Sequence, residues 1–267
     1  MTVRQFRTII YAYYARHKRQ MPWRDTRNSY HILVSEVMLQ QTQVTRVLDK
    51  YAGFTRVFPD IRTLARASLA DILSEWQGLG YNRRALLLKR LAERVVTDYG
   101  GRIPCEREIL KTLPGIGEAT SGAVCAFAFD QPVVFIETNI RSVFIHHFFR
   151  DKKEVSDTRL LPWIEKTLDR KKPREWYYAL MDYGVYLKSE FPNPSRKSSH
   201  YAKQGKFEGS VRQIRGKILK ILLSRRRLPV CELYELVCPD KKRCDTIADA
   251  LCEEGLLKKR GGFLSLP

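Results

Sequence analysis

The sequence predicts an all-α protein that ends in a small module with a β-hairpin. Apolar residues recur at helical spacing rather than in alternation, most clearly between Asn82 and Tyr99. Prolines and glycines interrupt this pattern at short intervals, so the expected helices have about one to four turns. With 267 residues, of which 44% are hydrophobic, the chain can bury a substantial core.

The composition divides the chain into three segments. Residues 1–190 carry the helical pattern, whereas residues 191–209 are polar, basic and rich in proline and serine, which predicts a linker. Within residues 210–267 we expect three short helices, and the Gly261–Gly262 pair then predicts a terminal β-hairpin. This order of elements resembles a small winged helix.

The charge balance favours a polyanionic partner. Lysine and arginine outnumber aspartate and glutamate by 48 to 29. Nucleic acid is a better candidate than a membrane, because no apolar run approaches the roughly 20 residues of a membrane span and no apolar export signal begins the chain. We expect a soluble cytoplasmic protein, associated with the nucleoid if the source is prokaryotic. The basic C-terminal module either contacts DNA or presents a solvated basic surface.

The cysteine pattern does not predict a metal site. The chain contains six cysteines, and no two of them stand in a Cys-x-x-Cys pair. We expect reduced, partly buried thiols.

One glycine-rich turn separates two helical stretches and could hold a phosphate. In Leu113-Pro114-Gly115-Ile116-Gly117 the glycines permit positive φ angles and close backbone approach. The helix that follows would present its free N-terminal amides to an anion. An ordinary tight turn has the same composition, so this motif depends on its flanks for its interpretation.

Two glutamates occupy contrasting positions. Glu36 has apolar neighbours at helical spacing, which would desolvate its carboxyl group and raise its pKa. It is either a general acid or a structural carboxyl that accepts backbone hydrogen bonds. Glu137 precedes a predicted helix, whose dipole favours the ionised form, so it either stabilises a cation or simply caps the helix. Hydrolysis of a glycosidic bond uses such a pair of carboxyl groups.

Taken together, the motifs resemble those of the helix-hairpin-helix DNA glycosylases, and the upstream ones are similar to the MutY-like adenine glycosylases within that superfamily. In chain order they are Met21–Arg24, Ser35–Val44, Trp76–Tyr81, Leu113–Gly117 with the small-residue helix after it, and an acidic residue before Asn139. The resemblance runs from about Arg19 to about Gly184. It implies a two-lobed helical fold in which the N-terminal helix packs with residues 131–190.

The same resemblance implies a monomeric enzyme that acts on double-stranded DNA containing a damaged or mispaired base. Such an enzyme flips the base out of the duplex and cuts its N-glycosidic bond. Adenine opposite 8-oxoguanine or guanine is the expected target. Glu36 falls on the family's catalytic acid, which protonates adenine N7. Glu137 replaces the family's aspartate that stabilises the sugar cation, and Asn139 matches the asparagine beside it.

Further roles follow from the resemblance in the same way. Gln41 and Tyr81 match residues that the family inserts into the DNA stack, whereas Trp76 is expected in the core. The implied base-pocket residues are Arg19, Met21, Trp23, Arg24 and Asp182. The implied DNA-binding residues are Gln40, Gln41, Tyr81, Leu113, Gly115, Ile116, Gly117 and Thr120.

The chain departs from the family at three places. Strand-cutting members carry a lysine nucleophile where this chain has Ala119, which implies a monofunctional glycosylase that uses water. Family members carry four cysteines for a 4Fe-4S cluster, but residues 185–206 contain none, so we expect no cluster and no other cofactor. The third departure is the exchange of aspartate for Glu137.

Two alternatives remain at this point. Thymine glycosylases of the same superfamily also carry a glutamate at the position of Glu36, so removal of thymine or uracil from mismatches is the first. A non-catalytic DNA-binding protein on a glycosylase fold is the second, suggested by Glu137 and by the missing cluster cysteines. The opposite base is left open, because MutY-like enzymes read 8-oxoguanine partly through a larger C-terminal domain.

Overall fold

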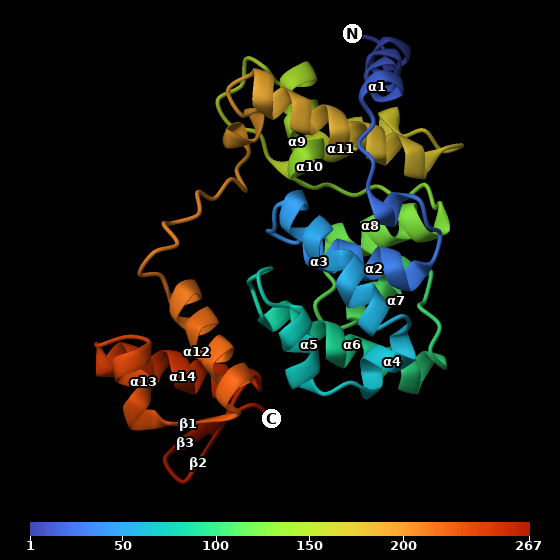
Figure 1. Cartoon of the computed structure of the whole chain (residues 1–267). Helices are drawn as coiled ribbons and strands as arrows, with labels where there is room; N and C mark the ends of the chain where they lie inside the picture. The colour runs from blue at the N-terminus through green and yellow to red at the C-terminus, as the bar shows by residue number, and fades with distance from the viewer. The chain divides into compact units, whose positions relative to one another are not determined.

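A computed structural model describes residues 1–267 and confirms the predicted all-α class (Figure 1). Fourteen α-helices make up most of the chain, and three short β-strands lie near its C-terminal end. None of the helices is long and apolar enough to cross a membrane.

The chain forms two compact units, and each of them is discontinuous in sequence. Unit 1 consists of residues 1–36, 104–112 and 116–203. Unit 2 consists of residues 37–103, 113–115 and 204–267. The chain therefore passes from one unit to the other within the helix that carries Glu36 and again at the glycine-rich turn.

Unit 1 holds most of the aromatic core. Its helices are α1 (Val3–His17), the first part of α2 (Ser29–Leu39), α7 (Arg107–Thr112), α8 (Glu118–Phe129), α9 (Thr138–Phe148), α10 (Asp157–Thr167) and α11 (Pro173–Glu190), with short 3-10 helices η1 (Pro22–Arg24) and η2 (Pro194–Lys197). Phe6 of α1 packs against Phe144 of α9 and Trp176 of α11, with ring centroids 5.3 and 5.9 Å apart. Helix α1 thus lies against α9 and α11 across a shared core.

A glycine sets the close approach of α11 to the start of α9. A Cβ atom added to Gly184 would lie 2.5 Å from the carbonyl oxygen of Asn139. No larger residue fits there without moving the helices apart. Gly184 therefore determines where the first turn of α9, with its acidic N-cap, sits on unit 1.

The first part of the predicted linker is folded onto unit 1. The Val155 amide donates to the Lys197 carbonyl at 2.8 Å, and the Ser199 amide donates to the Val155 carbonyl at 3.1 Å. Asn193 accepts from the amide of Ser195 at 3.0 Å, and Ser195 is buried. Proline, asparagine and serine are typical of capped turns as well as of linkers, so composition did not distinguish the two.

Unit 2 contains α3 (Val44–Val57), α4 (Ile61–Arg66), α5 (Leu69–Glu75) and α6 (Arg83–Tyr99). Asp60 and Ser68 cap α4 and α5 through their side chains, and Gly100 ends α6 in the left-handed conformation. Helix α6 packs its apolar face on α4 and α5. This face begins with a charged residue, Arg84, which is buried.

The C-terminal part of unit 2 contains the three expected helices and the expected hairpin. These elements are α12 (Val211–Arg225), α13 (Val230–Leu236), α14 (Lys241–Glu254), β2 (Lys258–Arg260) and β3 (Phe263–Ser265). The sequence did not predict β1 (Arg227–Pro229), a strand of three residues that ends in proline and pairs antiparallel with β3. The carbonyl of Glu254 accepts a hydrogen bond from Arg90 of α6 at 3.2 Å.

Candidate active site

Glu36 presents a carboxyl group without a hydrogen-bonding partner. It lies on α2 after the buried residues Ile32 and Leu33. Its side chain is half-buried, and desolvation by the surrounding protein raises its pKa to about 8. The negative charge of Glu137 raises the pKa further, whereas Arg24 lowers it. The carboxyl group is therefore mostly protonated at neutral pH, as a general acid requires.

Glu137 is the N-cap of α9, and its carboxylate is folded back onto that helix. One oxygen accepts from the Ile140 amide at 2.7 Å, and the other accepts from Asn139 Nδ2 at 3.1 Å. These bonds fix the position of the carboxylate at the N-terminal end of the helix. The Oδ1 atom of Asn139 is buried and has no hydrogen-bonding partner. The carboxylate of Glu137, fixed by two hydrogen bonds, therefore lies next to the side-chain oxygen of Asn139, which has no donor.

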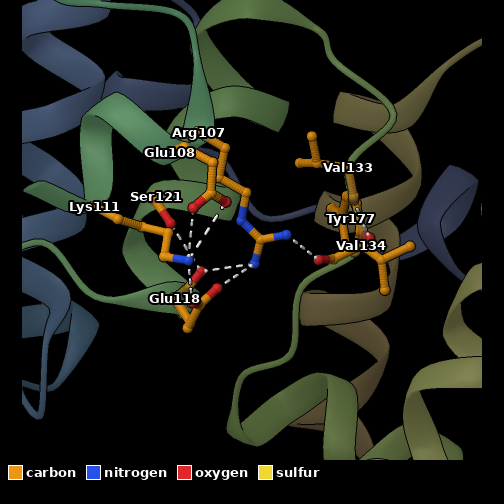
Figure 2. Close-up of polar contacts among 8 residues, drawn as sticks. All are labelled: Arg107, Glu108, Lys111, Glu118, Ser121, Val133, Val134 and Tyr177. Atoms are coloured by element: carbon orange, nitrogen blue, oxygen red, sulfur yellow. Dashed lines mark hydrogen bonds and ion pairs between the residues drawn. The ribbon is translucent and has the colours of Figure 1, made fainter.

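The extended segment before Glu137 is held by side chains from other helices (Figure 2). Arg107 of α7 donates to the carbonyl of Val134 at 2.7 Å, and Tyr177 of α11 donates to the carbonyl of Val133 at 2.7 Å. Arg107 also donates to the Glu118 carboxylate at 3.0 Å. Because this segment has no regular secondary structure, these contacts supply the partners that its backbone lacks and keep Glu137 in place.

The predicted base-pocket residues come together within unit 1, at η1 and on α11. Asp182 is almost fully buried and accepts four hydrogen bonds of 2.7 to 3.0 Å from the backbone amide and Nε of Arg19 and both terminal nitrogens of Arg24. Burial opposes its ionisation, but the arginines outweigh this and lower the pKa of Asp182. Met21 and Trp23 are also buried, at 4% and 2% exposure. Asp182 therefore anchors the two arginines, and of this set Arg19 is the most exposed.

The residues predicted to enter DNA gather in unit 2. Gln40 donates to the Gly115 carbonyl at 3.3 Å, which joins the end of α2 to the glycine-rich turn. Gly115 has a φ of +80° and lies against Leu87 of α6. Gln41 is exposed and Tyr81 is half-buried. The Tyr81 hydroxyl accepts hydrogen bonds from Gln204 and Arg212, both in the C-terminal part of the same unit.

Of the remaining turn residues, Leu113 belongs to unit 2, whereas Ile116, Gly117 and Thr120 belong to unit 1. Leu113 and Ile116 are buried, Thr120 is half-buried, and Gly117 is the N-cap of α8, where no side chain caps the helix. The expected anion site is next to an acid, Glu118, whose carboxylate pairs with Lys111 at 2.5 Å and has a lowered pKa because of that contact. The pairing limits the repulsion that Glu118 would exert on a phosphate.

Sequence reasoning missed Arg84, which bonds the segments around Gln41 and Tyr81. Its side chain falls in the apolar stripe of α6, one helical turn before Leu88. A charged residue at an apolar position of an amphipathic helix was the available signal.

The cysteine positions do not fit a 4Fe-4S cluster of the family type. All six cysteines are free thiols, and none lies in residues 185–206. No group of three or more histidine, cysteine or acidic side chains is arranged to hold a metal ion.

Comparison with known proteins places this geometry in a family. The profile described as HhH-GPD superfamily base excision DNA repair protein matches residues 34–166. An adenine DNA glycosylase of Mycobacterium tuberculosis is 33% identical over 282 residues, covering 91% of this chain and 89% of that protein. The chain belongs to the HhH-GPD superfamily of base excision DNA repair proteins. The family inferred from the motifs is thus confirmed.

Other HhH-GPD proteins show the same fold. A thymine/uracil-DNA glycosylase of Methanothermobacter thermautotrophicus is 31% identical over 209 residues, covering 74% of this chain and 94% of that protein. The structure of a thermostable thymine-DNA glycosylase has a TM-score of 0.62 and 28% identity, covering 68% of this chain and 86% of that one. An endonuclease III in complex with DNA shares the fold at a TM-score of 0.55 and 19% identity, over 70% and 86% of the two chains.

The raised pKa of Glu36 predicts a pH profile for base release. The carboxyl group keeps its proton below pH about 8, so the single-turnover rate should be level there and fall about tenfold for each pH unit above. Glu36→Gln removes the proton and should cost a factor of about 10² to 10⁴, with DNA affinity within a few fold of wild type. A rate that rises through pH 8, or a fully active Glu36→Gln variant, would exclude Glu36 as the acid.

The capping role of Glu137 allows its charge and its reach to be tested separately. Aspartate is a favoured N-cap residue, so Glu137→Asp should keep the melting temperature while moving the carboxylate by about 1.5 Å. Misplacement on this scale should cost up to about 10² in rate. Glu137→Gln keeps the length but removes the charge and should lose more activity. Single-turnover kinetics measures the activity of each variant, and thermal melting measures its stability. Equal activity of the wild type and both variants would assign cation stabilisation to another group.

Proposed function

We propose that this chain is a monofunctional adenine DNA glycosylase. It removes adenine mispaired with 8-oxoguanine or guanine from double-stranded DNA by base flipping and acid-assisted hydrolysis. The observation that carries the proposal is the contrast between the two carboxyl groups: burial raises the pKa of Glu36 to about 8, whereas Glu137 caps α9 and accepts two hydrogen bonds. Purine release needs an acid and an anion of this kind.

In the proposed reaction the N-glycosidic bond breaks with its electron pair on the leaving adenine. Glu36 gives its proton to N7 of the base, which makes adenine a better leaving group. Positive charge then develops on the sugar, and the carboxylate of Glu137, held by Asn139 and the Ile140 amide, stabilises it. Water adds to C1′, and its proton returns to a carboxylate.

The nucleophile is proposed to be water because the second residue of α8 is not a lysine. Ala119 occupies the position where strand-cutting relatives carry lysine, and it is exposed. We propose a monomer that acts in the cytoplasm, with the nucleoid if the source is prokaryotic.

Adenine is favoured over pyrimidines as the target. The adenine glycosylase relative covers 91% of this chain, and Gln40-Gln41-Thr42-Gln43 matches the adenine-specific members. Thymine or uracil opposite guanine is the second candidate, supported by the thymine/uracil-DNA glycosylase relative and by the thymine-DNA glycosylase structure. A non-catalytic DNA-binding role is disfavoured by the presence of Glu36 and Asn139 together.

Single-turnover assays on a panel of duplexes test the target. Adenine opposite 8-oxoguanine and opposite guanine should be released faster than thymine or uracil opposite guanine. Borohydride should trap no covalent adduct in quantity, because no imine forms when water is the nucleophile. Release of thymine without release of adenine would support the second candidate, and no release of any base would support the non-catalytic role.

We also propose that the enzyme works without an iron-sulfur cluster, since residues 185–206 supply no cysteine. Purified protein should contain iron far below one equivalent and should lack broad visible absorbance. Iron near four equivalents per chain, retained after gel filtration, would contradict this.

A further inference from the structure

The two terminal nitrogens of Arg84 donate six hydrogen bonds inside unit 2, whereas its buried Nε has no partner. Its side chain is 8% exposed and points from the first turn of α6 into the protein. Burial lowers the pKa of Arg84 to about 10, so the guanidinium stays charged at neutral pH. It donates to the carbonyls of Val37, Met38 and Gln40 at 2.8, 2.8 and 2.6 Å, and to Thr42 Oγ1, the Leu79 carbonyl and the Gly80 carbonyl at 2.8, 3.3 and 3.1 Å.

These acceptors belong to the last turn of α2 and to two loops that carry the residues expected to enter DNA. Gln41 and Tyr81 have φ angles of +53° and +48°, in the left-handed region that non-glycine residues seldom adopt. A conformation of this kind persists only where its surroundings hold it. Arg84 binds the carbonyl of Gln40 and the carbonyl of Gly80. It thereby fixes the peptide group that directly precedes each left-handed residue.

Other contacts join the same two loops around the guanidinium. The Thr42 hydroxyl accepts from Arg84 and lies 3.2 Å from the Leu79 carbonyl, to which it donates. The indole of Trp76 donates to the Gly80 carbonyl at 3.1 Å. The guanidinium also lies 5.5 Å from the centre of the Tyr81 ring.

We infer that Arg84 is a positioning residue for base flipping, because its guanidinium holds Gln41 and Tyr81 in the backbone conformations from which they enter the DNA stack. The inference rests on the proposed function and assigns a role that acts through these two residues. A planar fork of five donors can span both loops, whereas the single ammonium of a lysine cannot.

The test compares Arg84→Lys and Thr42→Val with a matched control. Arg83→Lys is the control, because Arg83 is the exposed neighbour on α6 and forms no hydrogen bond or ion pair. Thr42→Val keeps the side-chain shape, removes one acceptor, and leaves the charge of Arg84 in place. Thermal melting reports whether each variant is folded, and fluorescence anisotropy reports its affinity for DNA.

The decisive readout is the flipped fraction, measured with 2-aminopurine in place of the target adenine opposite 8-oxoguanine. Its fluorescence rises when the base leaves the stack. At saturating enzyme, the fluorescence rise of Arg84→Lys should be at least five-fold smaller than that of the wild type. Its single-turnover rate of adenine release should fall by up to about 10²-fold, because misplaced groups reduce rates on this scale. Thr42→Val should lose part of both, and Arg83→Lys neither.

The outcomes separate the inference from the proposed function. If Arg84→Lys is folded and shows the full fluorescence rise, Arg84 has only a structural role and the inference is wrong. If Arg84→Lys does not fold, the same criterion applies to Thr42→Val: a folded variant with the full fluorescence rise would show that the inference is wrong. Wild-type protein that shows no rise and releases no adenine would contradict the proposed function itself, and the inference with it.

Discussion

The arrangement of unit 2 depends on one buried guanidinium. A charge taken out of water is costly unless hydrogen bonds replace its hydration, and the two terminal nitrogens of Arg84 donate to six oxygen acceptors, whereas its buried Nε has no partner. Three of these acceptors lie in the last turn of α2 or just after it, where helical carbonyls lack partners of their own. The same hydrogen bonds therefore offset the cost of burying the guanidinium and give partners to the carbonyls of the loops.

Helix α6 acts as a platform for three separate segments through its first two turns. Arg84 holds residues 40–42 and 79–80, and Leu87 packs against Gly115, at a distance that leaves little room for a larger residue. Gln40 then bonds the carbonyl of Gly115 and joins the first segment to the third. Segments that are remote in sequence are thus brought together by one helix end.

Unit 1 uses the same chemistry around its carboxyl groups. Arg174 donates to the carbonyls of Arg24, Thr26 and Phe127 at 2.6 to 2.8 Å, and Arg24 in turn binds both oxygens of Asp182. Because Asp182 partly neutralises Arg24, that arginine lowers the pKa of Glu36 only in part, and burial keeps it near 8. The proton on Glu36 is therefore maintained by a balance among burial, Glu137 and Arg24.

The sequence by itself determined the helical class and the family. Helical periodicity and short motifs are local, so SEVMLQQT and LPGIG were sufficient for these conclusions. It also determined the absence of cysteines from residues 185–206. Composition was insufficient for residues 191–199, because a capped turn packed on α9 contains the same residue types as a linker.

Only the tertiary structure decided how these residues are supported. Asp182 is a predicted base-pocket residue, and the fold shows that both of its carboxylate oxygens accept hydrogen bonds from Arg19 and Arg24, near the N-terminal end of the chain. Arg84 looked like one more basic residue on an amphipathic helix, although it holds both predicted insertion loops. Hydrogen bonds to backbone carbonyls do not depend on the identity of the residue that supplies the carbonyl. Such contacts therefore leave almost no pattern in the sequence, and folding alone brings the arginine and its acceptors together.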